Sequence, residues 1–88
     1  MENALDIATD DLQKTISCRL AELRRQRGLT SNVRFGEVAG VSRAYLDLID
    51  KGRANFTLKK LVQLAAALDV EPYELLIPLD SEGGPAGR

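Results

Sequence analysis

The chain has 88 residues, of which 44% are hydrophobic and 28% are charged. This length suits one small domain and leaves no room for a deep catalytic cleft, and the hydrophobic share is typical of a globular protein. The single cysteine, Cys18, excludes an internal disulfide and gives no sign of secretion. No apolar run is long enough to cross a membrane, and the N-terminus carries acidic residues where a signal peptide would be basic. We therefore expect a cytoplasmic protein with no membrane partner.

Residue types that perform catalysis are missing or isolated in this chain. It has no histidine, no cysteine–histidine cluster with metal spacing, no glycine-rich phosphate loop and no pairing of a nucleophile with a base. We expect no catalytic residues, no metal and no cofactor, and therefore no enzyme.

The charge is distributed unevenly along a chain whose net charge is only −1. Residues 1–18 have a net charge of −3, and residues 61–88 have a net charge of −4. Residues 19–60 hold ten Arg or Lys against four Asp or Glu, which gives a net charge of +6. Such a segment favours a polyanionic partner, nucleic acid above all, although it could also be a solvated basic face.

The first expected helix runs from about residue 10 to residue 27. Thr9 or Asp10 can cap its N-terminus. Apolar residues then recur at intervals of four and three, at Leu12, Ile16, Leu20 and Leu23. Residues 1–8 show no clear period, and residues 1–9 are expected to be a flexible N-terminal segment. Cys18 lies within the helix, and we expect a packed, unreactive thiol because no base or second cysteine is available to activate it.

Residues 35–50 hold a short helix, a tight turn and a second short helix. The first helix has an apolar face formed by Phe35, Val38 and Ala39. Gly40 can adopt the positive φ that a sharp helix exit needs, and Ser42 is a strong N-cap for the second helix. The second helix turns Leu46 and Ile49 toward the same core and leaves its other side chains facing outward. This arrangement is typical of a helix-turn-helix, whose second helix lies in the major groove of DNA.

Two more helices are expected after the motif. Thr57 can cap a fourth helix, whose apolar stripe is Leu58, Leu61, Leu64, Ala65 and Leu68. Pro72 can begin a short fifth helix that ends near Ile77. Residues 80–88 have the composition of a disordered tail. The sequence therefore predicts an all-α, five-helix domain over residues 10–79.

Three runs of this sequence resemble the lambda-repressor/Cro-like, or XRE-like, helix-turn-helix family: LAELRRQRGLT, VAGVSRAYLDLIDKG and TLKKLVQLAAALDVEPYELL. The resemblance covers roughly residues 16–77. Within the family, GVSRAY and GRANFTLKKL look most like the small controller proteins of restriction–modification systems and like repressors of mobile elements. The resemblance implies a lambda-repressor-like domain, with its helix-turn-helix at helices 2 and 3, that binds an operator in double-stranded DNA and regulates transcription, its own gene included.

The outward side chains of the second motif helix are the expected base contacts: Arg43, Ala44, Tyr45 and Asp47. Arg43 could hydrogen-bond a guanine edge or only a phosphate, and Tyr45 could contact the DNA backbone or be packed and partly buried. Asp47 departs from what a DNA-facing helix usually carries. It could orient Arg43, accept a hydrogen bond from cytosine, or oppose DNA binding altogether.

Polar and basic side chains around the motif are the expected phosphate contacts: Asn32, Arg34, Ser42, Lys51, Arg53, Asn55, Thr57 and Lys59. Compared with the family, one extra residue precedes Phe35, which places Ser31 at the usual cap and Asn32 at a usual glutamine. Lys60 is expected to be a solvated lysine. The family also implies a structural ion pair between Arg24 and Asp50.

One such domain reads about three to four base pairs, too few to define a target, so we expect a homodimer on a near-palindromic operator. The expected dimer surface is the apolar remainder after helix 4, namely Tyr73, Leu76, Ile77 and Leu79. These residues could instead all belong to the core, where Leu75 is expected. RNA polymerase is a further candidate partner.

The alternative function is a protein–protein interaction module, such as an anti-activator or an antitoxin-like protein, built on the same fold. Asp47, an exposed Leu48 and the acidic ends of the chain favour this alternative. The basic central segment and the family resemblance favour DNA.

Overall fold

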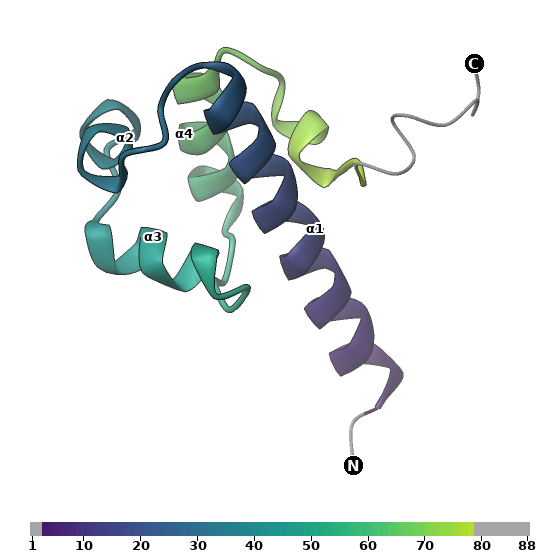
Figure 1. Ribbon diagram of the computed structural model, residues 1–88. Helices are drawn as coiled ribbons and strands as arrows, with labels where there is room; N and C mark the ends of the chain where they lie inside the picture. Colours follow the sequence, from purple (N-terminus) through teal and green to yellow (C-terminus); the bar gives the residue numbers. More distant parts are fainter. Residues whose placement is uncertain (1–2, 79–88) are drawn as a thin grey trace.

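The structure, a computed structural model, describes residues 3–78, and this part of the chain is all-α (Figure 1). It consists of α1 (Ala4–Gln26), α2 (Asn32–Ala39), α3 (Arg43–Asp50), α4 (Leu58–Leu68) and the 3-10 helix η1 (Pro72–Leu76). The predicted all-α helix-turn-helix fold is confirmed, but the fifth helix is a 3-10 segment and not an α-helix. The predicted tail, residues 80–88, and Leu79 lie outside the described residues.

Helix α1 begins earlier than the sequence predicted. Asn3 caps it, because the Asn3 Oδ1 accepts a hydrogen bond from the Asp6 N–H at 2.8 Å. Thr9, a predicted cap, lies inside the helix, where its hydroxyl donates to the Leu5 carbonyl at 2.8 Å. The predicted start near residue 10 was therefore wrong, because the exposed first turns carry no apolar period that would reveal a helix. In Figure 1 this first part of α1 extends beyond the other helices.

Helices α2 and α3 and the turn between them are fixed by local signals that the sequence contained. Ser31 caps α2 and Ser42 caps α3, each hydroxyl accepting a backbone N–H of the first turn, at 3.2 Å and 3.1 Å respectively. Gly40 leaves α2 with a φ of 74°, in the left-handed region that glycine adopts without strain. The predicted motif and its caps are confirmed.

Thr57 caps α4 as predicted, its hydroxyl accepting the Lys60 N–H at 3.1 Å. Pro72 occupies the start of η1, where a missing N–H costs nothing. A capping box between Glu71 and Glu74 also satisfies backbone N–H groups at the N-terminus of η1.

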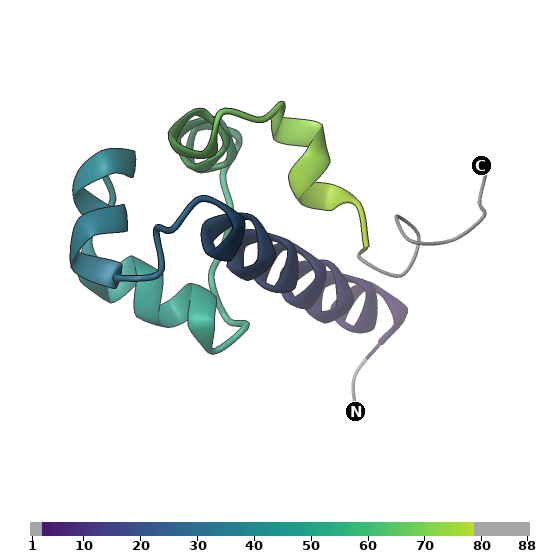
Figure 2. The same ribbon diagram turned by 45° about the horizontal axis from the view of Figure 1, so that its top comes forward.

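The core draws on every helix, and its largest fully buried side chains are Leu20, Phe35, Leu46, Leu64, Leu68 and Leu75. Helix α1 packs against α3 and η1, α4 packs against α2 and η1, and α2 packs against α3 (Figure 2). The buried Arg19 joins α1 to η1, because its Nε donates to the Glu74 carbonyl at 3.1 Å.

Several residues that were expected to be packed are exposed, among them Leu12 on α1, which is 47% exposed. Val38 on α2 is 51% exposed and Leu58 on α4 is 82% exposed. Cys18 is exposed as well, since α1 turns other residues toward the core. A helical period identifies one apolar side of a helix, but the packed width of that side depends on the neighbouring helices.

Arg24 is buried near the end of α1, with 7% of its surface exposed. Its Nε donates to the Leu29 carbonyl at 2.8 Å, and its Nη2 donates to the Thr30 carbonyl at 3.0 Å. Its Nη2 also donates to the Asn32 Oδ1 at 2.8 Å, and the guanidinium lies 4.5 Å from the centre of the Phe35 ring. One side chain thus holds the end of α1, the connection that follows and the start of α2.

The predicted ion pair between Arg24 and Asp50 is indirect. The Asn32 Nδ2 donates to the Asp50 Oδ2 at 3.2 Å, so Asn32 bridges the two charged groups. Burial lowers the pKa of the Arg24 guanidinium, and the Asp50 charge opposes that shift. The two charges interact across Asn32, and no local pattern in the sequence identifies this bridge.

We expect Arg24→Met to lower the free energy of unfolding by about 2–4 kcal/mol, since it removes three hydrogen bonds and leaves partly buried acceptors unpaired. Urea unfolding followed by circular dichroism measures this change. The control is Arg25→Met, which removes an exposed arginine whose partner in the described part of the chain is Glu22, and which should change stability by about 0.5 kcal/mol or less. Equal losses for the two variants would contradict a special role for Arg24.

Candidate nucleic-acid interface

Helix α3 has one buried side and one exposed side, as the sequence predicted. Leu46 and Ile49 are buried, whereas Arg43, Ala44 and Asp47 are exposed. Within residues 3–78 no hydrogen bond or ion pair engages the Arg43 or Asp47 side chains, so the option that Asp47 orients Arg43 is not realised. The first turn of α3 therefore presents a guanidinium that is available to a ligand.

Tyr45 is held against the domain and does not extend from this outer side. Its hydroxyl donates to the Asn55 carbonyl at 2.9 Å, and its ring meets Phe56 edge-on with the ring centres 6.1 Å apart. The Lys60 Nζ lies 5.2 Å from the centre of the Tyr45 ring. Burial raises the pKa of the Tyr45 hydroxyl. Of the two alternatives for Tyr45, the geometry favours packing, and Lys60 is a half-buried partner of that ring where the sequence predicted a solvated lysine.

The α3–α4 loop, residues 51–57, connects the C-terminus of α3 to α4. Gly52, with a φ of 71°, closes the end of α3, and the Arg53 N–H donates to the Leu48 carbonyl at 2.9 Å. Ala54 is completely buried. The Gln13 Nε2 of α1 donates to the Ala54 carbonyl at 2.8 Å, which fixes the loop against the first helix.

Most predicted phosphate contacts lie exposed around α3: Arg34, Ser42, Lys51, Arg53, Asn55, Thr57 and Lys59. Ser42 and Thr57 use their hydroxyls as helix caps, and Asn32 is the half-buried bridge to Asp50. In the described part of the chain no acidic side chain pairs with the cations among them. These cations could therefore interact with a polyanion without first breaking an internal ion pair.

Two glutamines that the sequence analysis overlooked contact the backbone before and after α3. Gln13 contacts the loop after α3, and the Gln63 Nε2 of α4 donates to the Gly40 carbonyl at 3.3 Å, in the turn before α3. A single polar residue on the inner side of a helix has no periodic signal, and its backbone acceptor lies far away in sequence. Nothing local could have identified either contact.

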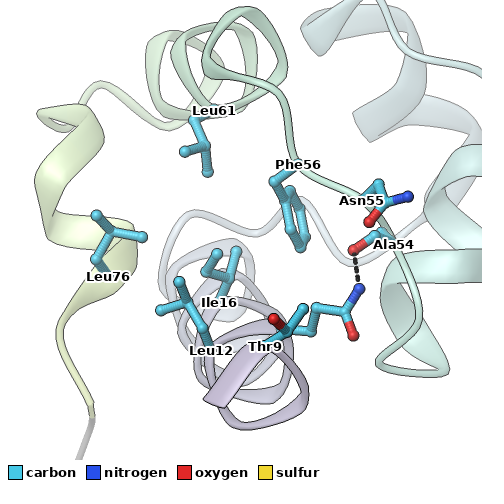
Figure 3. A pocket seen from close by; sticks show the side chains of 9 residues that line it. Thr9, Leu12, Ile16, Ala54, Asn55, Phe56, Leu61 and Leu76 are labelled. Carbon is cyan, nitrogen blue, oxygen red and sulfur yellow. Dashed lines mark hydrogen bonds between the residues drawn. The ribbon is translucent and has the colours of Figure 1, made fainter. Parts of the chain in front are cut away.

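The predicted dimer residues that the structure describes are partly exposed: Tyr73 is 64% exposed, Leu76 is 39% exposed and Ile77 is half-buried. Leu76 also lines an apolar groove of about 280 Å³ between α1, the α3–α4 loop, α4 and η1. Figure 3 shows Leu12 and Phe56 on other sides of this groove.

No helix within residues 3–78 is long and apolar enough to cross a membrane.

The shifted pKa of Tyr45 predicts a loss of stability at high pH. Because folding raises this pKa, the unfolded chain loses the phenolic proton first, near its ordinary pKa of about 10. The contribution of Tyr45 is complete below that pH and falls as the pH rises toward the folded-state pKa. Denaturant unfolding between pH 8 and pH 11 should show a smaller decline for Tyr45→Phe than for the wild type. Tyr73→Phe, which removes the exposed tyrosine, is the control and should lose stability with pH as the wild type does. If Tyr73→Phe loses as little stability as Tyr45→Phe, the prediction is contradicted.

Comparison with known proteins agrees with the fold. Residues 20–75 match the helix-turn-helix family described as HTH_3. The uncharacterized HTH-type transcriptional regulator y4dJ of Sinorhizobium fredii is 39% identical over 70 residues, which are 80% of this chain and 90% of that protein.

Two solved structures are similar. The hypothetical transcription factor NHTF from Neisseria matches with a TM-score of 0.76 and 27% identity, over 84% of each chain. The restriction–modification controller protein C.AhdI from Aeromonas hydrophila matches with a TM-score of 0.66 and 36% identity, over 72% of this chain and 94% of that one. The resemblance to controller proteins that the sequence suggested is thereby confirmed. The chain belongs to the XRE-like helix-turn-helix family of transcriptional regulators, which is not an enzyme family.

Proposed function

We propose that this protein is a sequence-specific regulator that binds a near-palindromic operator in double-stranded DNA as a homodimer and controls its own gene. RNA polymerase is its second proposed partner, where the operator adjoins or overlaps a promoter. The observation that carries the proposal is the exposed first turn of α3, whose Arg43 has no partner within residues 3–78.

The proposed base contacts come from the first turn of α3 and from the exposed residue one turn later on the same helix. An Arg43 guanidinium can donate two hydrogen bonds to a guanine edge, and the Ala44 methyl can meet a thymine methyl. Asp47, one turn later, can accept a hydrogen bond from the amine of cytosine. For Tyr45 we propose an indirect contribution, because its hydroxyl already donates to Asn55.

The proposed phosphate contacts surround these residues. Arg34 on α2, Lys51 and Arg53 in the α3–α4 loop, and Lys59 on α4 supply exposed positive charge. The N-termini of α2 and α4 add backbone N–H groups, which favour a phosphate for the same reason that they favour an acidic cap. Such contacts set the affinity and make it depend strongly on salt.

The second candidate, a module that binds a protein, is favoured by a specific feature of the same surface. Asp47 is exposed and unpaired within the described residues, and the neighbouring Leu48 is 43% exposed. An acid and an apolar side chain beside each other suit a protein partner better than a phosphate backbone.

Selection of tight binders from a random duplex library separates the two candidates. If the proposal is right, the selected sequences share two inverted half-sites about one helical turn apart. Fluorescence anisotropy should then show tight binding to the selected duplex and to the DNA upstream of the gene, with weaker binding to a scrambled duplex. A library without enrichment, together with equally weak binding to all duplexes, would reject the DNA-binding proposal and favour a protein partner.

We expect Arg43→Ala and Arg53→Ala to weaken DNA binding in different ways. Arg43→Ala should cost about 1–3 kcal/mol at the selected operator and little at scrambled DNA, because it removes a base contact. Arg53→Ala should weaken binding to both duplexes alike. It should also reduce by about one the slope of the logarithm of the binding constant against the logarithm of the salt concentration. Anisotropy titrations at several salt concentrations measure both effects. Arg25→Ala, which removes an arginine paired with Glu22 on α1, is the control and should change neither quantity.

We expect Leu76→Glu to weaken the homodimer, since it places a charge on the proposed apolar surface after α4. Sedimentation equilibrium at micromolar concentrations measures the dimer constant. Leu58→Glu is the control, because Leu58 is 82% exposed on α4 and lies outside this surface. A wild-type protein that sediments as a monomer, both alone and with operator DNA, would refute the dimer.

A further inference from the structure

The backbone of Ala54–Phe56, in the α3–α4 loop, is fixed by side chains. Within residues 3–78 these three residues form no hydrogen bond with other backbone groups. The Ala54 carbonyl accepts from the Gln13 amide at 2.8 Å, and the next carbonyl, of Asn55, accepts from the Tyr45 hydroxyl at 2.9 Å. Figure 3 draws the first of these bonds as the dashed line that ends at Ala54.

Each of these two donors lies on a helix, so each ties the loop to a rigid element. Gln13 lies on α1 and Tyr45 on α3, and both are half-buried. The same turn of α1 approaches the loop at a second point, because a Cβ at Gly52 would lie 3.6 Å from the Lys14 Cγ. The loop is thus held from both sides at adjacent residues.

The segment that is held in this way carries proposed phosphate contacts. Arg53 directly precedes Ala54, and Asn55 directly follows it. A contact formed by a pre-ordered group loses less conformational entropy on binding than one formed by a mobile loop. Removing an anchor of the backbone should therefore weaken the neighbouring contacts without removing any group that touches DNA.

We propose that Gln13 is a positioning residue for DNA binding, which acts through the Ala54 carbonyl on the phosphate contacts of Arg53 and Asn55. This inference rests on the proposed function. Gln13 precedes residues 20–75, the part of the chain that matches the family, so a residue outside that part contributes to the interface.

The test compares Gln13→Met, which retains the length of the side chain but loses the donor, with the wild type. Gln26→Met is the matched control, since Gln26 lies on the same helix and, within residues 3–78, its side chain donates to Glu22 alone. We expect Gln13→Met to lower the affinity for the selected and the scrambled duplex alike, by about 3- to 10-fold, and to reduce the salt dependence of binding. Gln26→Met should bind both duplexes as the wild type does. Hydrogen exchange of the Gly52 and Arg53 amides, which donate to the Ile49 and Leu48 carbonyls, should accelerate in the DNA-free protein only in Gln13→Met.

A double-mutant cycle with Arg53→Ala distinguishes positioning from general destabilisation. If Gln13 acts through the loop, Gln13→Met should have a smaller effect in the Arg53→Ala background than in the wild type. Gln13→Asn, whose amide is one carbon too short to reach Ala54, should reproduce the loss and serves if Gln13→Met does not fold. All titrations use temperatures at which circular dichroism shows a folded protein.

The outcomes separate the inference from the function on which it rests. A wild-type protein without salt-dependent DNA binding refutes the proposed function. If the wild type binds DNA but the Gln13 variants bind equally well, or if their losses add fully to that of Arg53→Ala, the positioning role is refuted and the proposed function stands.

Discussion

The buried guanidinium of Arg24 is the contact on which the placement of α3 depends. It binds two carbonyls of the connection after α1 and the amide of Asn32, and Asn32 in turn binds Asp50 at the end of α3. A charged group can remain in such a site only if its donors are satisfied and an opposite charge is near. The requirement to satisfy Arg24 therefore fixes α1, α2 and α3 relative to one another.

This dependence follows from the length of the motif helices. Helices α2 and α3 have eight residues each, whereas an isolated helix shorter than about 12–15 residues is marginal in water. Leu46 and Ile49 bury one side of α3, but burial alone does not fix where its two ends lie. Gln63 contacts the turn before α3, and Gln13 contacts the loop after it. The segments at both ends of α3 are thus anchored by α1 and α4, which lie outside the motif.

The sequence predicted what depends on near neighbours and missed what depends on distant ones. The caps at Ser42 and Thr57 and the left-handed Gly40 were found because each acts within a few residues of itself. The early start of α1 was missed because Asn3 caps a turn without an apolar period. The Asn32 bridge and the two glutamine contacts join residues that lie 18 or more positions apart, so no local pattern contains them.

The distribution of charge explains how a chain with a net charge of −1 could attract DNA. At an ionic strength of 0.1 M a charge is screened over about 10 Å, so a phosphate responds to nearby side chains and not to the total. Asp6 lies 18 residues before Arg24 on α1, which separates them by about 27 Å along the helix. Close to α3 the exposed cations lack internal acidic partners within the described residues, while Asp47 opposes a phosphate beside Arg43. Because Arg43 and Asp47 carry opposite charges one helical turn apart, their combined attraction for a phosphate is small. Under the proposed function, discrimination between sequences would therefore come from hydrogen bonds to base edges.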